Sequence, residues 1–255
     1  MKVALLQSEI VWEDAQANRD HFESLIRNAT DKPDLVVLPE MFTSGFTMQP
    51  ANVAETMEGP TVDWMRRIAE VHDCAVTGSL VISEGGLYRN RLLFVMPSGE
   101  THFYDKRHLF SLAGEDQVYA AGTNRLIVTY RGWRICPLIC YDLRFPVFSR
   151  NTESYDLLLY AANWPKPRIN AWDVFLQARA VENMCYTVGV NRVGTDHNSH
   201  QYPGHSQVVD FSGNYALAPQ YTEGLYVVAL DKPSMLAARQ KFGFLDDRDT
   251  FELRT

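Results

Sequence analysis

Apolar and polar residues along the chain alternate in stretches that predict both helices and strands. Apolar side chains recur every three or four residues over 14–30, 61–72 and 170–185, which is the spacing of amphipathic helices. A short helix is expected after Phe148 and another from residue 231. Short apolar runs predict strands at residues 2–7, 34–39, 74–82, 87–96, 101–106, 126–130, 134–139, 156–163, 187–194, 205–211 and 225–230.

The order of these elements favours an α/β fold. Helical patterns separate apolar strands, and Glu84-Gly85-Gly86 predicts a hairpin between two of the strands. We therefore expect a sheet covered by helices on at least one face. Residues 107–124 form a long irregular segment, which is typical of a functional loop. The longest helical pattern gathers apolar residues on one side, namely Ala171, Val174, Phe175, Ala178, Val181 and Met184.

Length and composition predict one globular domain over residues 1–255. The sequence has no internal repeat, low-complexity segment or linker, and 46% of its residues are hydrophobic and 22% charged. The formal net charge of −7 argues against nucleic-acid or anionic-membrane binding, because both partners favour a basic surface.

The N-terminal residues and the cysteines favour a cytoplasmic protein. The stretch MKVALLQSEIVWEDA has an apolar run that is too short for a signal peptide, and it contains several acidic residues. No apolar run reaches the length of a membrane span. Four cysteines without regular spacing are typical of reduced thiols. Cys74, Cys136 and Cys185 have apolar neighbours in sequence, so we expect them in the core.

Three apolar strands are followed by a reactive side chain. DLVVLP is followed by Glu40, THFYD by Lys106 and PLI by Cys140. In open α/β sheets, functional sites lie beyond the ends of the strands, where a rigid backbone positions the side chains. A carboxylate, an ammonium group and a thiol can serve as base, oxyanion stabiliser and nucleophile, so together they suit acyl transfer. Taken alone, Glu40 and Lys106 are more typical of solvated residues than of catalysts, and Cys140 is about equally consistent with a core thiol.

No metal or organic cofactor is expected. His197, His200 and His205 lie in the polar stretch TDHNSHQYPGH, but their spacing is not that of zinc ligands. Cys136 and Cys140 are not spaced as a C-x-x-C redox pair.

Three motifs resemble those of the nitrilase, or carbon–nitrogen hydrolase, superfamily. They are LPEMF, YDKRHLF and CYDLRFP, in the order of the family, with 66 positions from Glu40 to Lys106 and 34 from Lys106 to Cys140. Together with MFTSGF, AANWP and ARAVEN, they are most similar to the omega-amidase, or 2-oxoglutaramate amidase, branch.

The resemblance implies a role for each matching residue. Cys140 would be the nucleophile and Glu40 its base, while Lys106 and the backbone N–H of Tyr141 would stabilise the oxyanion. Glu115, in LAGEDQ, matches a second glutamate that would hold the lysine and the substrate amide.

The same resemblance implies an architecture and an assembly. We expect a four-layer αββα sandwich, in which two mixed β-sheets pack face to face with helices outside. Proteins of this kind commonly pair through their helical faces, so we expect a homodimer.

The implied substrate is a small 2-oxo acid monoamide such as 2-oxoglutaramate. Its distant carboxylate requires an arginine or backbone donors, and Arg168 and Arg192 are the candidates. Arg144 is interpreted instead as an ion-pair partner of Asp142 or Glu182. The expected pocket walls are Phe42, Asn163 and Trp164, whereas Phe46 favours an aromatic core position.

The same motifs are compatible with other functions. A deaminated-glutathione amidase, an N-carbamoyl amidohydrolase or a nitrilase would share the same motifs. A non-catalytic binding protein on the same fold is a further alternative, although all three reactive residues are present.

Overall fold

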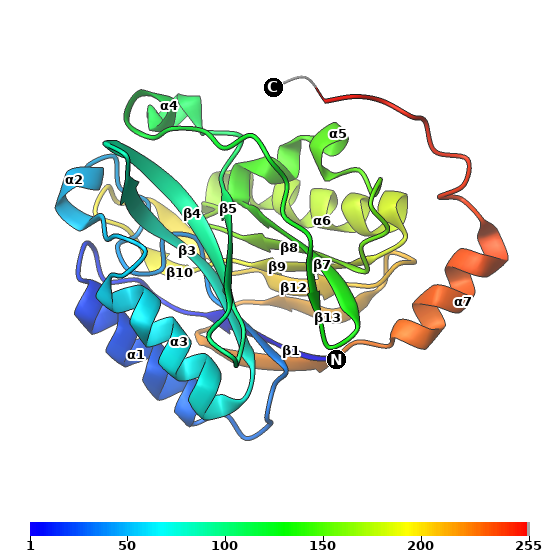
Figure 1. Cartoon of the computed structure of the whole chain (residues 1–255), viewed down its shortest axis with the longest axis horizontal. Helices are drawn as coiled ribbons and strands as arrows, with labels where there is room; N and C mark the ends of the chain where they lie inside the picture. The colour runs from blue at the N-terminus through cyan, green and yellow to red at the C-terminus, as the bar shows by residue number, and fades with distance from the viewer. Residues whose placement is uncertain (254–255) are drawn as a thin grey trace.

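The computed structural model describes residues 1–253 and contains two six-stranded mixed β-sheets that pack face to face (Figure 1). The first sheet has the order β14 (Gly224–Ala229), β1 (Lys2–Gln7), β2 (Leu35–Val37), β3 (Ala75–Glu84), β4 (Leu87–Val95) and β5 (Thr101–Asp105). The second has the order β13 (Tyr215–Gln220), β12 (Ser206–Val209), β9 (Tyr186–Val190), β8 (Leu157–Ala161), β7 (Trp133–Ile139) and β6 (Val128–Tyr130). Strands β10 (Val193–Thr195) and β11 (Gln201–Pro203) form a separate two-stranded sheet.

The two large sheets share one topology, although the sequence shows no repeat. In the first sheet β1, β2 and β3 are parallel, β14 and β4 flank this centre as antiparallel strands, and β5 is antiparallel to β4. In the second sheet β7, β8 and β9 are parallel, β6 and β12 flank this centre as antiparallel strands, and β13 is antiparallel to β12. The parallel centres bring the ends of β2, β7 and β8 to the region where the reactive residues follow.

Helices cover both outer faces, which confirms the four-layer αββα sandwich (Figure 1). Helices α1 (Ala15–Arg27) and α3 (Pro60–His72) lie on the first sheet, and α5 (Pro146–Ser149) and α6 (Ile169–Asn183) lie on the second. Short helices α2 (Pro50–Val53) and α4 (Glu115–Val118) lie in loops, and α7 (Lys232–Phe242) follows the last strand. Within residues 1–253, the structure has no helix long and apolar enough to cross a membrane.

The side-chain alternation of β1 explains how the first sheet joins two apolar layers. Val3 and Leu5 lie in the core between the sheets, whereas Ala4 and Leu6 pack with residues of α1 and α3. A strand buried on both faces requires such an uninterrupted apolar run. The parallel centre therefore forms a rigid support for the residues that follow it.

The apolar side predicted for the longest helix is not its buried side. Val174 and Val181 are 52% and 51% exposed, whereas Trp172 and Leu176 are buried against β9. Gly189 of β9 permits this packing, because a Cβ there would lie within 2.6 Å of both side chains. The buried side of α6 also holds polar residues, which obscure the period in the sequence.

Other differences concern irregular and edge segments. Strand β13 was not predicted, since YALAPQ contains a proline and lies at the edge of the sheet, where Pro is tolerated. The irregular segment 107–124 contains the 3₁₀ turn Ser111–Ala113 and the helix α4.

Candidate active site

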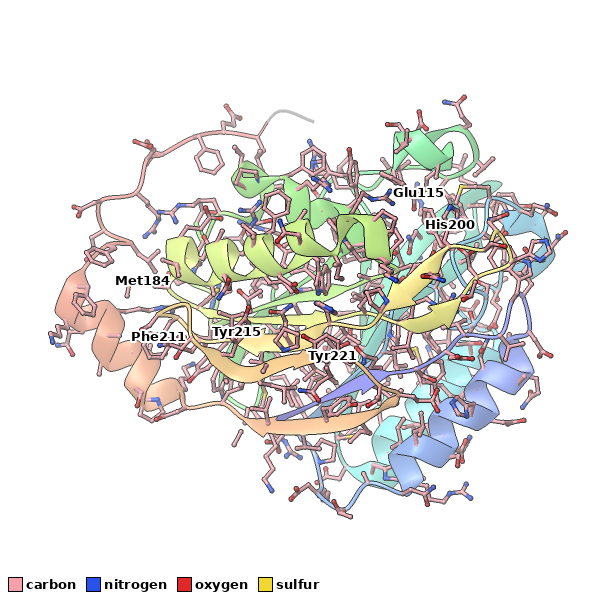
Figure 2. All side chains as sticks on the ribbon, turned by 180° about the vertical axis from the view of Figure 1, so that it is seen from behind. Glu115, Met184, His200, Phe211, Tyr215 and Tyr221 are labelled. Carbon is pink, nitrogen blue, oxygen red and sulfur yellow. The ribbon has the colours of Figure 1, made fainter. Side chains whose placement is uncertain are left out.

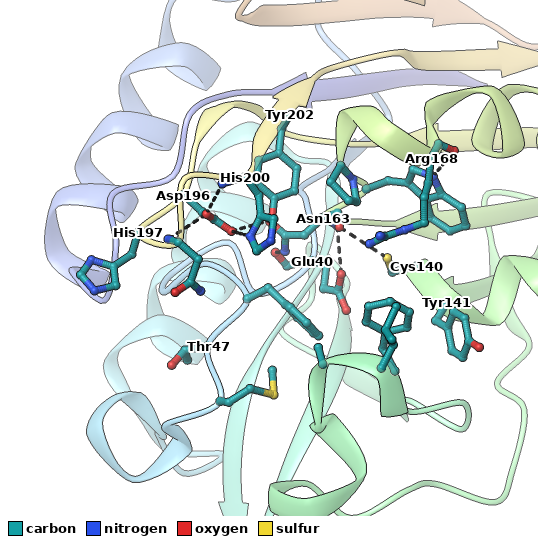
Figure 3. Close-up of a pocket in the computed structure, with 18 of the residues that line it drawn as sticks. Glu40, Thr47, Cys140, Tyr141, Asn163, Arg168, Asp196, His197, His200 and Tyr202 are labelled. Atoms are coloured by element: carbon teal, nitrogen blue, oxygen red, sulfur yellow. Dashed lines mark hydrogen bonds and ion pairs between the residues drawn. The ribbon is translucent and has the colours of Figure 1, made fainter.

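A cavity of about 750 Å³ opens at the end of the molecule where both parallel centres terminate (Figure 3). Figure 2 shows Glu115 and His200 at this end, far from Met184 and Phe211. The inner wall includes residues from both sheets, namely Glu40, Lys106, Cys140, Tyr141 and Asn163. The remaining wall comes from loops, 3₁₀ turns and β11, namely Trp12, Glu13, Phe46, Thr47, Met48, Gln49, Phe110, Leu112, Ala113, Arg144, Trp164, Pro165, Arg168, Asp196, His197, Asn198, His200 and Tyr202.

Glu40 follows β2 and is completely buried. Its Oε1 accepts a hydrogen bond from the Nζ of Lys106 at 2.8 Å, and its Oε2 accepts one from the backbone N–H of Asn163 at 2.9 Å. The amide of Asn163 also donates to the carbonyl oxygen of Glu40 at 2.6 Å. The backbone carbonyl and the carboxylate of Glu40 are therefore both fixed. One carboxylate oxygen is bonded to Lys106, which follows the first sheet, and the other to Asn163, which follows the second.

Lys106 follows β5 and lies between two carboxylates. Its backbone N–H donates to the carbonyl of Asn90 on β4, which fixes the segment beyond the strand. Its Nζ donates to Glu40 and also to both carboxylate oxygens of Glu115, at 3.0 and 2.8 Å. The backbone N–H of Phe110 donates to Glu115 at 2.6 Å, so the loop before α4 is tied to the same cluster.

Cys140 begins a 3₁₀ turn, Cys140–Arg144, directly after β7. Its φ of 41° lies in the left-handed region, which is strained for a residue with a side chain and typical of functional turns. The Sγ lies 3.9 Å from the backbone carbonyl oxygen of Asn163. The strand end and the sharp turn together place the sulfur at the inner wall of the cavity.

The electrostatics of the cluster link these groups. Burial raises the pKa of the Cys140 thiol, Glu40 raises it further, and Lys106 lowers it. Burial also raises the pKa of Glu115, against the opposing effect of Lys106. The two carboxylates raise the pKa of the Lys106 ammonium group, which burial alone would lower. The lysine is therefore charged, while the thiol is protonated at neutral pH and needs a base to ionise.

Asp142 joins the turn after β7 to the segment after β5. Its carboxylate is completely buried and accepts hydrogen bonds from the backbone N–H of Ile139 at 3.0 Å and from the hydroxyl of Tyr104 at 2.8 Å. It also accepts from the backbone N–H of His108 at 3.1 Å, and the ring of His108 stacks on Phe145. These bonds fix the distance between the segments that carry Lys106 and Cys140.

The structure brings most of the predicted site residues to the cavity, but not all. Trp164 and Arg168 line it as expected. Phe42 is buried among Phe22 and Trp64 in the core under α1 and α3, whereas Phe46 lines the cavity. The expectation for these two phenylalanines was therefore wrong, because sequence spacing does not reveal the sharp turn after Glu40.

Arg192 is not a wall of the cavity. Its guanidinium group is buried, donates to the backbone carbonyls of Val193 and Ile10, and lies over the ring of Tyr202. It braces the loop behind the cavity wall.

Arg144 does line the cavity, and its interpretation as an ion-pair partner was wrong. The guanidinium group lies 5.1 Å from the ring centroid of Trp164 and has no carboxylate partner among residues 1–253. Asp142 is bonded to Tyr104 and His108 instead, and Glu182 pairs with Arg179. Arg168, over the ring of Phe110, is likewise without an ion-pair partner in the described chain.

The remaining cysteines and histidines occupy other environments. Cys74, Cys136 and Cys185 are completely buried in the core, as predicted. His205 contacts Asp173, His200 contacts Asp196, and His197 stacks on Trp12 at the rim of the cavity.

Sequence reasoning missed several residues of the cluster. Asn90 donates to both Glu40 and Glu115, and Asp142 organises the turn after Cys140. The signals in sequence were weak, because Asn90 lies between Arg89 and Arg91 in the polar half of its strand and Asp142 lies inside the motif CYDLRFP. The loop from Asp196 to Tyr202 also lines the cavity, although its histidines suggested a solvated loop.

Comparison with known proteins agrees with the geometry. The family model described as carbon-nitrogen hydrolase matches residues 2–240. The chain is 44% identical over 254 residues to the omega-amidase YafV of Escherichia coli (strain K12), which covers 99% of this chain and 98% of the relative. It is 28% identical over 250 residues to the 2-oxoglutaramate amidase of Bacillus subtilis (strain 168), with 96% of each chain covered.

A solved structure shows the same fold and a similar sequence. XC1258 from Xanthomonas campestris, described as a CN-hydrolase superfamily protein with an arsenic adduct in the active site, superposes with a TM-score of 0.97. The two chains are 42% identical, and the match covers 100% of this chain and 99% of the other. The chain therefore belongs to the carbon–nitrogen hydrolase family, within the nitrilase superfamily.

Proposed function

We propose that this protein is an omega-amidase, which hydrolyses the terminal amide of a small 2-oxo acid such as 2-oxoglutaramate to the carboxylate and ammonia. The observation that carries the proposal is the meeting of Glu40, Lys106 and Cys140 at the inner wall of one cavity. The similarity to omega-amidases over nearly the whole chain supports the reaction and the class of substrate.

The first step forms a covalent bond between Cys140 and the substrate. The thiol is protonated at neutral pH, so Glu40 accepts its proton as the sulfur attacks the amide carbon. The carbonyl π electrons move to oxygen, and the resulting oxyanion faces Lys106 and the backbone N–H of Tyr141. Such donors commonly contribute about 3–4 kcal/mol to the transition state each.

The second half of the reaction restores the enzyme. Glu40 gives its proton to the amide nitrogen, the C–N bond breaks and ammonia leaves, with a thioester remaining on Cys140. Water then attacks the thioester carbon while Glu40 accepts one of its protons, and the proton returns to the departing sulfur. Glu115 holds Lys106 in place, and in the structure both of its carboxylate oxygens contact the lysine.

The substrate carboxylate is held by Arg144. The guanidinium group lies at the cavity wall without a carboxylate partner in the described chain, and Trp164 supports its face. A buried or half-buried arginine without a partner favours an anionic ligand, because the charge needs a counter-ion. Arg168, over the ring of Phe110, is a second cation that lines the cavity.

The test is ammonia release from a panel of substrates. The panel contains 2-oxoglutaramate, succinamate, an N-carbamoyl amino acid and a simple aliphatic nitrile, each with wild type and with Cys140→Ala. Fastest turnover of 2-oxoglutaramate, lost in the variant, supports the proposal. Turnover of the nitrile alone, or of the carbamoyl compound alone, would refute it.

A homodimer is part of the proposal. Val147, Val174 and Val181 are 52%, 52% and 51% exposed on the outer helical layer of α5 and α6, which leaves apolar side chains for a second copy to cover. Sedimentation velocity should give a dimer for wild type, and Val174→Asp with Val181→Asp should give a folded monomer. A monomeric wild type over the whole concentration range would contradict this assembly.

A further inference from the structure

Asn90 is a buried amide that bridges the two carboxylates of the cluster. It lies on β4, is 1% exposed, and does not line the cavity within the described chain. Its Nδ2 donates to the Oε1 of Glu40 at 2.9 Å and to the Oε1 of Glu115 at 3.1 Å. Both N–H bonds of one amide group are thus used on acidic side chains from two different loops.

The orientation of this amide follows from its acceptors. A carbonyl oxygen in place of Nδ2 would lie about hydrogen-bond distance from two carboxylates and would repel both. The Oδ1 of Asn90 accordingly points elsewhere, and it has no hydrogen-bond partner among residues 1–253. A buried carbonyl without a partner is unfavourable, so the two bonds to the carboxylates must offset its cost.

The bonds from Asn90 affect catalysis because, without a substrate, every N–H of the Lys106 ammonium group is already used. An ammonium group has three N–H bonds, and the Nζ of Lys106 has three carboxylate contacts, one with Glu40 and two with Glu115. An N–H can turn to an oxyanion only if one of these contacts weakens. The Oε1 atoms of Glu40 and Glu115 are the two oxygens that also accept from Asn90.

We propose that Asn90 is a positioning residue that allows Lys106 to direct one N–H to the oxyanion, because the Oε1 of Glu40 and the Oε1 of Glu115 keep a donor from Asn90 when the lysine releases either of them. The inference rests on the proposed function and assigns a role to a residue that the substrate does not touch. It applies to the transition state more than to substrate binding, because the oxyanion is absent from the bound substrate.

The same amide influences protonation within the cluster. The titratable groups that face it or its neighbours are Glu40, Glu115, Lys106, Cys140 and Tyr119. Donors to a carboxylate favour its ionised form, so removing them favours protonation of the carboxylate pair. Since the base acts in its ionised form, the acidic limb of the activity profile should move to higher pH.

The test compares Asn90→Leu with a matched control, Asn151→Leu. Asn151 is also completely buried, and its Nδ2 also donates to two acceptors, the carbonyls of Tyr155 and Asn183, away from the cavity. In Asn90→Leu we expect kcat to fall about 10- to 100-fold with KM within about threefold of wild type. The acidic limb should move up by roughly half a pH unit or more. Asn151→Leu should lower Tm with kcat and the pH profile unchanged.

Two results would overturn the inference. One is an Asn90→Leu variant with the kcat and the pH profile of wild type. The other is an Asn151→Leu variant in which kcat falls and the acidic limb shifts as far as in Asn90→Leu. If Asn90→Leu does not fold, Asn90→Asp replaces it, since it keeps the shape but presents an acceptor to both carboxylates. Wild-type turnover by that variant refutes the role. If wild type prefers another amide, the proposed substrate is wrong, and the Asn90 comparison is made with that amide.

Discussion

The Nδ1 of His108 lies 2.7 Å from the Oδ1 of Asp142, and this contact joins the segment that carries Lys106 to the turn that carries Cys140. The carboxylate of Asp142 is completely buried, so its charge depends on the donors around it. The pair therefore acts as a fixed spacer between the two sheets at the inner wall of the cavity.

Removing the ring of His108 should loosen this spacer. We expect His108→Ala to lower the free energy of unfolding by about 1–3 kcal/mol, because a buried carboxylate loses a donor. The control is His102→Ala, since His102 contacts the exposed Glu100 at 3.2 Å on the surface and should contribute less than about 1 kcal/mol. Urea titrations of both variants measure the difference. Equal losses would argue against the spacer.

Glu40 should have opposite effects on turnover and on thiol ionisation. Glu40→Gln removes the base, so kcat should fall by about 10²- to 10⁴-fold. It also removes a negative charge that raises the pKa of Cys140, while Lys106 remains and lowers it. The thiol should therefore ionise at lower pH in the variant. Alkylation of the Cys140 peptide as a function of pH, followed by mass spectrometry, measures this. An upward shift would contradict the arrangement.

Arg144 should determine the preference for an anionic substrate. Arg144→Met should lower kcat/KM for 2-oxoglutaramate by about 10- to 100-fold, because a charge-assisted pair is lost. A neutral amide of similar length, such as butyramide, should be hydrolysed equally by the variant and wild type. Arg168→Met and Arg192→Met are the matched arginine controls. A larger loss in Arg168→Met would assign the carboxylate to Arg168, whereas Arg192→Met should leave the preference unchanged because Arg192 does not line the cavity.

Stability should decrease at alkaline pH because of the buried thiols. Burial raises the pKa of Cys74 to about 11 and that of Cys185 to about 12, whereas an unfolded thiol has a pKa near 8.5. As pH rises, the thiol ionises first in the unfolded state, which lowers the free energy of unfolding. The contribution of the protonated, buried thiol to stability is therefore complete below pH 8.5 and is lost as pH rises through the folded pKa. Between about pH 9 and 11, each such thiol should contribute a slope of roughly −1.4 kcal/mol per pH unit. Cys185→Ala should reduce the slope by that amount in denaturation curves, and an unchanged slope would contradict the assignment.

The sequence was sufficient to predict the elements built on long apolar runs and the residues directly behind them. The strand at 2–7 and the helix at 61–72 were correct because their periods are regular. Glu40, Lys106 and Cys140 each come shortly after the end of a strand. Their positions along the chain therefore already predicted that they lie at one end of the sheets. The structure brings these three residues together, while their catalytic roles remain predictions.

The remaining parts depend on contacts that sequence spacing does not encode. Phe42 and Phe46 are four residues apart, and a turn with Met41 at a φ of 44° directs one to the core and the other to the cavity. Arg144 and Arg192 are chemically alike, and only the packing of their loops decides which one lines the cavity. Asn90 was missed because it lies between Arg89 and Arg91, where a third polar residue suggests an exposed strand and not a buried amide.

The division of the reacting groups between the sheets has a consequence for heat inactivation. Glu40 and Lys106 extend from the first sheet, and Cys140 and Asn163 extend from the second. A slight sliding of one sheet over the other would separate sulfur from carboxylate while every strand kept its own hydrogen bonds. During slow warming, enzymatic turnover should therefore disappear several degrees before the circular dichroism of the backbone changes.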